Sequence, residues 1–238
     1  MQDFDLTQVN FPEGYVALID KPLRWTSTDV VRKVNYALRH KGYKKIKVGH
    51  AGTLDPLATG VLLICIGKAT KRVNELQAEA KEYIAEVTLG ATTPSFDMEH
   101  EIDKHYPTEH ITREMIQTAL VGLCGERFQI PPIYSAKKID GVRAYELARA
   151  GEEVEVRKAL VNIYDIEILD LSMPRLTIRV SCSKGTYIRS LAFEIGEALQ
   201  SGAYLSALRR TRSGGYRVED GWQLDDFMKK LELLETKL

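Results

Sequence analysis

The stretch 48–71 constrains the fold most, because it joins a glycine-rich loop directly to an apolar strand. It reads V-G-H-A-G-T-L-D-P-L-A-T-G-V-L-L-I-C-I-G-K-A-T-K. Its glycines allow backbone conformations that side chains forbid, and Pro56 biases Asp55 away from helix. Residues 61–66 are apolar throughout, as expected of a buried strand. The sequence therefore predicts a loop that presents a carboxylate beside a rigid strand.

Two other interpretations of this stretch are weighed. An aspartate before proline is often no more than a side-chain turn, and Asp55 alone fits that description. The run from Gly67 to Thr70 resembles the end of a phosphate-binding loop, but that motif needs a glycine where Leu62 stands and Ser or Thr where Ala69 stands. No nucleoside triphosphate site and no nucleotide cofactor are predicted.

Composition indicates an ordinary folded chain that is long enough to bury a sizeable core. The 238 residues include 33 basic and 33 acidic side chains, so attraction to nucleic acid must come from local clusters. Solvated charged faces are the alternative explanation for each cluster. The basic clusters are Arg39, His40, Lys41, Lys44, Lys45 and Lys47; Lys68, Lys71 and Arg72; and Arg209, Arg210, Arg212 and Arg217.

Cysteine usage and hydropathy favour a cytoplasmic protein. Cys65, Cys124 and Cys182 have no C-x-x-C spacing, which predicts reduced thiols rather than a metal site or a disulfide. The longest apolar run is too short to span a membrane, and residues 1–10 lack the character of a signal sequence.

The first predicted elements are a strand over 14–19 and a helix that begins near Ser27. Ser27 is expected to cap this helix and Asp29 to favour its positive end. The helix is expected to stop near Gly42. Its apolar face would consist of Val30, Val31, Val34 and Leu38.

Further along, alternation predicts strands over 81–90 and 175–182, with 161–169 as another strand of one sheet. Tyr83 falls on the apolar face of the first of these strands and is by pattern a core aromatic. A helix is expected over 112–123, and a second begins after the junction 183–191. That junction suits anions, because helix amides and basic side chains point the same way, although an ordinary capped helix fits as well.

Several of these segments together resemble the TruB family of tRNA pseudouridine synthases. The matching strings are D-K-P at 20–22, G-H-A-G-T-L-D-P-L-A-T-G at 49–60, G-K-A-T-K at 67–71, K-E-Y at 81–83, C-S-K-G-T-Y-I-R-S-L at 182–191 and L-R-R-T at 208–211. The resemblance implies that Asp55 is the catalytic residue and that Arg189 pairs with it. It also implies that Tyr83 stacks on the target base and that Tyr187 borders the base pocket.

The same resemblance assigns three further substrate-binding residues. Leu208 would pack at the base site, His50 would fill the stack vacated by a flipped base, and Lys21 belongs to the first motif. By its residue type alone, His50 is more simply a hydrogen-bonding loop residue. Two departures from the family pattern stand out: Arg24 occupies a position where relatives usually carry glycine, and Pro94 interrupts the segment before Asp97.

The expected architecture is α+β: the pseudouridine synthase fold, with a mostly antiparallel central sheet flanked by helices and loops. Residues 1–218 would form the catalytic domain, with about 128–155 as a thumb-like segment that clamps RNA. Residues 219–238 would form a short tail without a separate PUA-like domain. The implied reaction isomerises uridine at position 55 in the tRNA T-loop, by base flipping, without cofactor or metal. The chain would act as a monomer on the T-arm.

Two other functions remain open on the residues alone. An RNA-binding module without chemistry would need the basic clusters and aromatics but not Asp55. A hydrolase with an aspartate nucleophile would need a second carboxylate as acid, for which Asp20 and Asp97 are the candidates.

Overall fold

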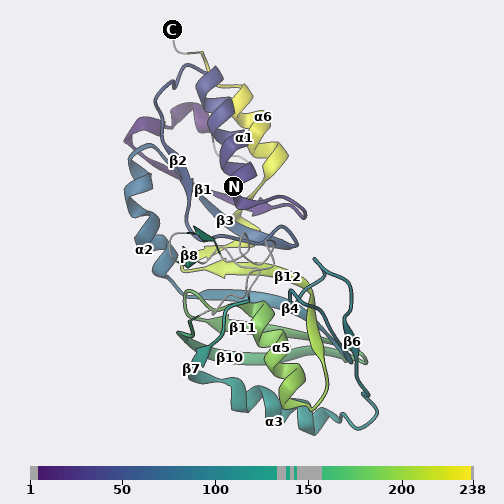
Figure 1. The fold of residues 1–238 in the computed structure, drawn as a ribbon. Coiled ribbons are helices and arrows are strands. Elements are labelled where there is room, and N and C mark those ends of the chain that lie inside the picture. The colour runs from purple at the N-terminus through teal and green to yellow at the C-terminus, as the bar shows by residue number, and fades with distance from the viewer. Residues whose placement is uncertain (1–4, 133–137, 140–141, 144–156, 237–238) are drawn as a thin grey trace. The chain divides into compact units, whose positions relative to one another are not determined.

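The computed structural model describes residues 5–132, 138–139, 142–143 and 157–236. The chain divides into two compact units, Met1–Tyr83 with Arg209–Leu238, and Ile84–Leu208 (Figure 1). Most of the predicted thumb-like segment, about 128–155, lies outside the described residues.

In the first unit, a sheet carries α1 and α6 on one face and α2 on the other. The strand order is β14-β1-β3-β12, in which β1 pairs antiparallel with β3 and parallel with β14. The strands are β1 (Tyr15–Lys21), β2 (Val48–His50), β3 (Ala58–Ile66), the end of β12 (Ala203–Ser213), β13 (Tyr216–Arg217) and β14 (Trp222–Gln223). The helices are α1 (Ser27–His40), α2 (Val73–Ala78) and α6 (Leu224–Glu232), with 3-10 helices η1 (Leu6–Gln8), η2 (Phe11–Glu13), η3 (Gly67–Arg72) and η4 (Val218–Asp220).

Residues 61–66 of strand β3 are all apolar because both faces of this part of the strand are covered. Leu62, Ile64 and Ile66 join one core with residues of α1 and α6. The alternate side chains, such as Val61 and Leu63, join a second core with residues of η3 and α2. Since successive side chains of a strand point to opposite faces, burial on both sides requires an unbroken apolar run. The predicted buried strand is confirmed and extends back to Ala58.

In the second unit, the strand order is β12-β4-β11-β10-β7. Strand β10 pairs antiparallel with both β11 and β7. Side chains of β4 alternate between buried and half-buried, as the sequence predicts, with Tyr83 among the buried ones. The elements are β4 (Lys81–Leu89), β5 (Ala91–Thr92), β6 (Lys104–His105), α3 (Arg113–Leu123), β7 (Gly125–Gln129), β8 (Lys138–Ile139), β9 (Val142–Arg143), β10 (Ala159–Ser172), β11 (Arg175–Cys182), α5 (Ile188–Ala198) and β12.

The start of α1 differs from the prediction. Thr26, not Ser27, is the capping residue: its hydroxyl accepts from the amide of Asp29, whose carboxylate in turn accepts from the Thr26 amide. Ser27 is the first helical residue and is buried. Its hydroxyl does not cap the helix, because it bonds to the backbone of Leu54. The sequence offered two adjacent hydroxyls, and only the reciprocal bond with Asp29 distinguishes them.

The segment 219–238, predicted to be a short tail, contains most of η4 and all of β14 and the amphipathic helix α6. Trp222, Phe227 and Leu231 are buried in the core shared with α1.

The expected α+β class with a mostly antiparallel sheet and flanking helices is confirmed. Among the helices of the described residues, none combines the length and apolar character needed to cross a membrane.

Candidate active site

The loop that carries Asp55 connects β2 to β3 and is held at its start by a buried arginine. Arg210 of β12 is only 2% exposed. Its Nε donates to the carbonyl of Val61 at 2.7 Å, and its Nη2 donates to the carbonyl of Gly52 at 3.1 Å. Its Nη1 lies 3.4 Å from the carbonyl of Thr53. One guanidinium therefore ties the loop to the strand that follows it.

The middle of the loop is fixed by Ser27 at the start of α1. The Ser27 hydroxyl accepts from the Leu54 amide at 2.9 Å and donates to the Leu54 carbonyl at 3.1 Å. The backbone N–H and C=O of the buried Leu54 are thereby both satisfied by a single side chain. Asp55 is the next residue, so these two hydrogen bonds fix the backbone immediately before it.

The far side of the loop rests on Lys21, whose side chain is fully buried. Its ammonium donates to the carbonyls of Pro22 at 2.9 Å and Trp25 at 2.5 Å, with the Pro56 carbonyl at 3.5 Å. The Pro56 carbonyl also accepts from the amide of Arg24 at 2.7 Å. Lys21 thus joins the D-K-P turn to the residue that follows Asp55.

Arg24 adopts a left-handed backbone conformation, with φ of 66°. Glycine is favoured in this region because a Cβ strains the backbone there. The departure noted in the sequence therefore falls at a position where the main chain itself favours glycine. The hydrogen bond from the Arg24 amide to the Pro56 carbonyl stabilises the turn despite this strain.

Gly60 shows how closely the strand after the loop approaches β12. Its φ is 101°, and a Cβ built there would lie 2.1 Å from the carbonyl oxygen of Arg210. A side chain at this position would separate the strand from the residue whose guanidinium holds the loop. Gly60 is therefore required by the same arrangement that orients Asp55.

Electrostatics link Lys21, Asp55, His50 and Arg210. Burial lowers the pKa of Lys21 to about 8, while the charge of Asp55 opposes this shift and that of Arg210 adds to it. Burial also lowers the pKa of His50, and Arg210 lowers it further, so the neutral imidazole is favoured. The Nδ1 atom of His50 is buried and has no hydrogen-bond partner among the described residues. Asp55 itself is half-buried in this loop, and its charge acts on the buried ammonium of Lys21.

In the second unit, Arg189 lies in the first turn of α5 and is 4% exposed. Its Nε is 3.6 Å from Oδ2 of Asp97, which is equally buried. The Asp97 carbonyl accepts from the hydroxyl of Thr93 at 2.7 Å, which fixes the backbone of this acid. Asp97, whose role the sequence left uncertain, is therefore a residue that orients Arg189.

Tyr187 precedes α5 and is held through its backbone. Its amide donates to Oε1 of Gln129 at 2.8 Å, and Gln129 is 1% exposed. The hydroxyl of Ser190 donates to the carbonyl of Ile130 at 2.7 Å. The start of α5 is thus anchored to the end of β7, a contact between segments far apart in the sequence.

The predicted site residues are distributed over both units. Lys21, His50, Asp55 and Tyr83 belong to the first unit, and Tyr187, Arg189 and Leu208 to the second. Within the first unit the structure brings Lys21 and Asp55 into electrostatic contact. The paired roles that the resemblance implies for residues of different units stay predictions.

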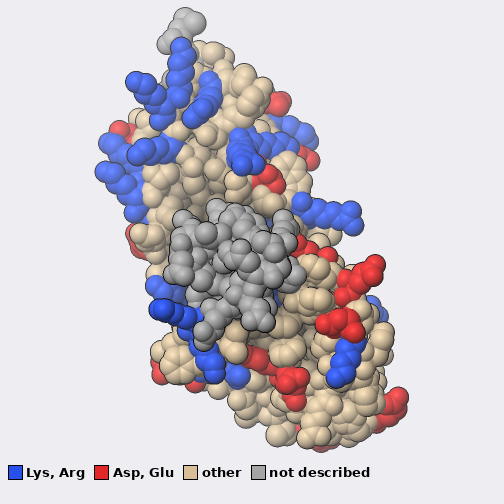
Figure 2. Space-filling view, in the orientation of Figure 1, with Lys and Arg blue, Asp and Glu red and all other residues tan. Residues whose placement is uncertain are grey.

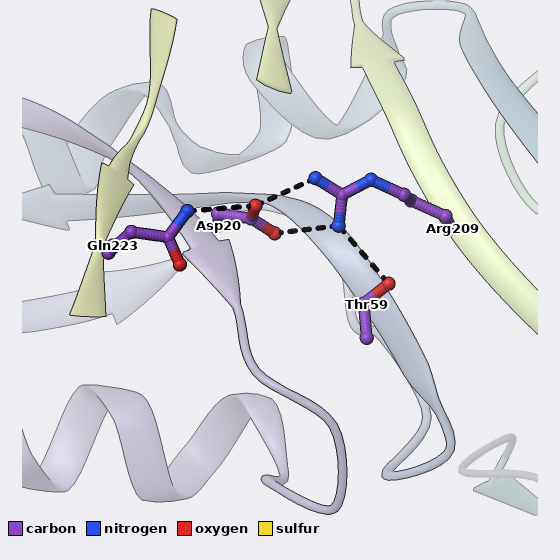
Figure 3. Close-up of polar contacts among 4 residues, drawn as sticks. All are labelled: Asp20, Thr59, Arg209 and Gln223. Carbon is purple, nitrogen blue, oxygen red and sulfur yellow. Dashed lines mark hydrogen bonds and ion pairs between the residues drawn. The ribbon is translucent and has the colours of Figure 1, made fainter. Parts of the chain in front are cut away.

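The basic cluster near the C-terminus is largely used inside the protein. The Arg209 guanidinium donates to both carboxylate oxygens of Asp20, at 3.1 and 2.7 Å, and to Thr59 Oγ1 at 3.3 Å (Figure 3). Gln223 of β14 donates to the same carboxylate at 3.2 Å. In the sequence Arg210 is one member of this cluster, and its buried role was not predicted. Alternation along the observed strand places Arg209 and Arg210 on opposite faces, but it does not show which of the two faces is buried.

Both candidate acid partners for a hydrolase are engaged in ion pairs, Asp20 with Arg209 and Asp97 with Arg189. Within the described part of the chain, no three His, Cys, Asp or Glu side chains are grouped so as to hold a metal ion.

Comparisons with known proteins identify the family of the chain. Residues 39–188 match the N-terminal domain of TruB family pseudouridylate synthases, and residues 189–237 match the C-terminal domain of tRNA pseudouridylate synthase B. A tRNA pseudouridine synthase B of Phocaeicola vulgatus is 58% identical over 230 residues, which cover 96% of this chain and 98% of that protein.

Two solved structures have the same fold. One is a Cbf5-Nop10-Gar1 complex, with a TM-score of 0.70 and 32% identity over 92% of this chain and 54% of that one. The other is an H/ACA RNP bound to a substrate RNA containing 2'-deoxyuridine, with a TM-score of 0.66 and 30% identity over 90% of this chain and 52% of that one. The resemblance carried by the sequence motifs is confirmed, and the chain belongs to the TruB family of pseudouridylate synthases.

Proposed function

We propose that the chain converts uridine to pseudouridine at position 55 in the T-loop of tRNA, with Asp55 as the reacting group. The observation that carries this proposal is the three-sided support of the Asp55 loop by Arg210, Ser27 and Lys21. An irregular loop held this firmly can present one carboxylate in one geometry, as catalysis at a ribose requires. Family membership and the tRNA pseudouridine synthases among the relatives support the substrate.

The reaction breaks the bond between N1 of uracil and C1' of the ribose and forms a bond between C5 and C1'. The hydrogen on C5 leaves and N1 gains one, so the nucleotide keeps its atoms and its oxidation state. The enzyme therefore needs a reactive carboxylate, a pocket closed to water and a hold on the detached base. Asp55 supplies the first of these, and its carboxylate interacts electrostatically with the buried ammonium of Lys21.

The remaining residues would hold the nucleotide. Arg189, oriented by Asp97, would bind and orient the Asp55 carboxylate as a charge-assisted donor. Tyr83 and Tyr187 would stack on or border the flipped uracil, and Leu208 would pack beside it. A neutral His50 could replace the extruded base in the stack more easily than a charged one, since burial already favours its neutral form.

The test is to incubate the protein with an unmodified tRNA transcript and to map pseudouridine by carbodiimide modification and primer extension. One new stop is expected, one nucleotide 3' of position 55, and a transcript with cytidine at position 55 should show none. Binding without any pseudouridine would favour an RNA-binding module, and release of free uracil would favour a hydrolase. We expect the chain to act in the cytoplasm, as a monomer, on the T-arm.

A further inference from the structure

Two basic clusters that are separate in the sequence line one pocket of the first unit. The pocket has a volume of about 550 Å³. It is lined by the turn that follows α1, by Pro12 of η2 and by residues of η3. The lysines on its walls are Lys44, Lys45, Lys47, Lys68 and Lys71, all exposed, and none of the described residues that line it is acidic.

The pocket is built on close backbone packing rather than on side chains alone. The amide of Gly67 donates to the carbonyl of Lys47 at 2.8 Å, which joins η3 to the turn. A Cβ at Gly67 would lie 2.0 Å from the carbonyl oxygen of Phe11, so η2 and η3 are in direct contact. The backbone that carries the lysines is thus fixed before an anion binds.

Among the described residues, only one of the five pocket lysines is in an ion pair; those without one are Lys44, Lys45, Lys47 and Lys71. Lys68 pairs with Glu13 at 2.7 Å, and Arg72 pairs with Glu75 at 2.8 Å. Figure 2 shows basic side chains gathered over the part of the first unit that holds α1 and β2, with few acidic ones. In a chain with no net charge, such local excess marks a surface for a polyanion.

The pocket is connected to the candidate active site by β2. Lys47 directly precedes this strand and His50 ends it, so the two residues are roughly 10 Å apart at about 3.3 Å per residue. An RNA whose target nucleotide reaches the Asp55 loop would have neighbouring phosphates within reach of the pocket.

We propose that this pocket binds backbone phosphates of the substrate RNA close to the target nucleotide. The proposal rests on the proposed function, because it assumes that the polyanion is the RNA on which Asp55 acts. Lysine ammonium groups contact phosphates without reading bases, so the pocket would add affinity and orientation rather than sequence specificity.

The test measures tRNA binding in an Asp55→Asn background, where no turnover occurs. Replacing Lys44, Lys45 and Lys47 with glutamine should weaken binding about 10-fold and reduce the slope of log K against log salt by about 2 to 3. The matched control replaces Lys33, Lys229 and Lys230 with glutamine. This variant loses the same charge from α1 and α6, and its salt slope should change little. Replacing the three pocket lysines with arginine should keep the affinity.

A slope that falls equally in the pocket variant and in the control would overturn the proposal. Unchanged tRNA affinity in the pocket variant, together with saturable binding of inorganic phosphate that this variant loses, would also overturn it, because the pocket would then be a small-anion site. With wild-type Asp55, the pocket variant should keep kcat at saturating tRNA while KM rises. Absence of pseudouridine with the unaltered protein would refute the proposed function, whereas the binding comparison would still report on the pocket.

Discussion

The Asp55 loop and the Arg189 junction hold opposite charges in different ways. The loop is irregular, and side chains of Lys21, Ser27 and Arg210 fix it by bonding to its backbone. Arg189 stands on a helix, and a buried carboxylate, Asp97, holds its side chain directly. Backbone bonds therefore position the loop around Asp55. At Arg189 the recorded ion pair acts on the charged side chain itself.

Loss of the buried ion pair between Asp97 and Arg189 should lower the stability of the fold most. Asp97→Ala removes the carboxylate beside a buried guanidinium and should reduce the free energy of unfolding by about 3–5 kcal/mol. Urea denaturation of the whole chain measures this. Asp103→Ala is the control, because this exposed acid bonds only to Thr92 among its described partners and should cost about 1 kcal/mol. Equal losses would mean that burial of the pair is irrelevant.

Loss of the hydrogen bonds that hold the Asp55 loop should instead lower mainly the rate of pseudouridine formation. Arg210→Met leaves the carbonyls of Gly52 and Thr53 without their donor, and a displacement of about 1 Å at Asp55 should lower kcat about 100-fold. Single-turnover kinetics on saturating tRNA measure it. Arg209 lies on the same strand as Arg210, and Arg209→Met breaks its partly exposed ion pair with Asp20 of β1. This variant should lower kcat far less. A similar fall in both variants would remove Arg210 from its positioning role.

Lys21 gives the loop a pH dependence of stability with a defined sign. Its pKa is about 8 in the folded chain against an ordinary 10.5, so the unfolded chain binds more protons between these values. Stability contributed by this group therefore rises as pH increases from about 8 to 10.5. The difference in unfolding free energy between wild type and Lys21→Met should shift in favour of wild type between pH 7 and pH 10. A constant difference would contradict the burial of a charged ammonium.

The smallest expected effect concerns the strained turn beside the loop. Arg24→Gly should relieve a left-handed backbone and raise stability by about 0.5–1 kcal/mol, after the entropy of glycine in the unfolded chain is counted. The matched control is Arg32→Gly inside α1, which should lower stability by about 1 kcal/mol. A loss of stability in both variants would mean that the side chain of Arg24 outweighs the strain.

Local patterns in the sequence predicted most of the elements. Alternation placed Leu176, Ile178 and Val180 on the buried face of β11, and apolar spacing identified α5. The motifs singled out the Asp55 loop, because loop chemistry depends on neighbours in sequence. Contacts between distant segments could not be derived in this way.

Arg210 illustrates the limit. In the sequence it is one of several adjacent basic residues, and nothing local shows that it enters the core while Arg209 remains partly exposed. The same holds for the lysine pocket, where residues of 42–47 and 67–71 meet only because η3 packs against the turn after α1. Long-range packing decides both, and periodicity carries no information about it.

We propose that Asp55, and no other acid near its loop, performs the isomerisation. The test compares pseudouridine yield in a single turnover, and tRNA affinity, for Asp55→Asn and Asp20→Asn. We expect no pseudouridine from Asp55→Asn with affinity unchanged within about 2-fold, and product from Asp20→Asn. Product from Asp55→Asn, or loss of its affinity in parallel with its activity, would show that Asp55 is not the reacting group.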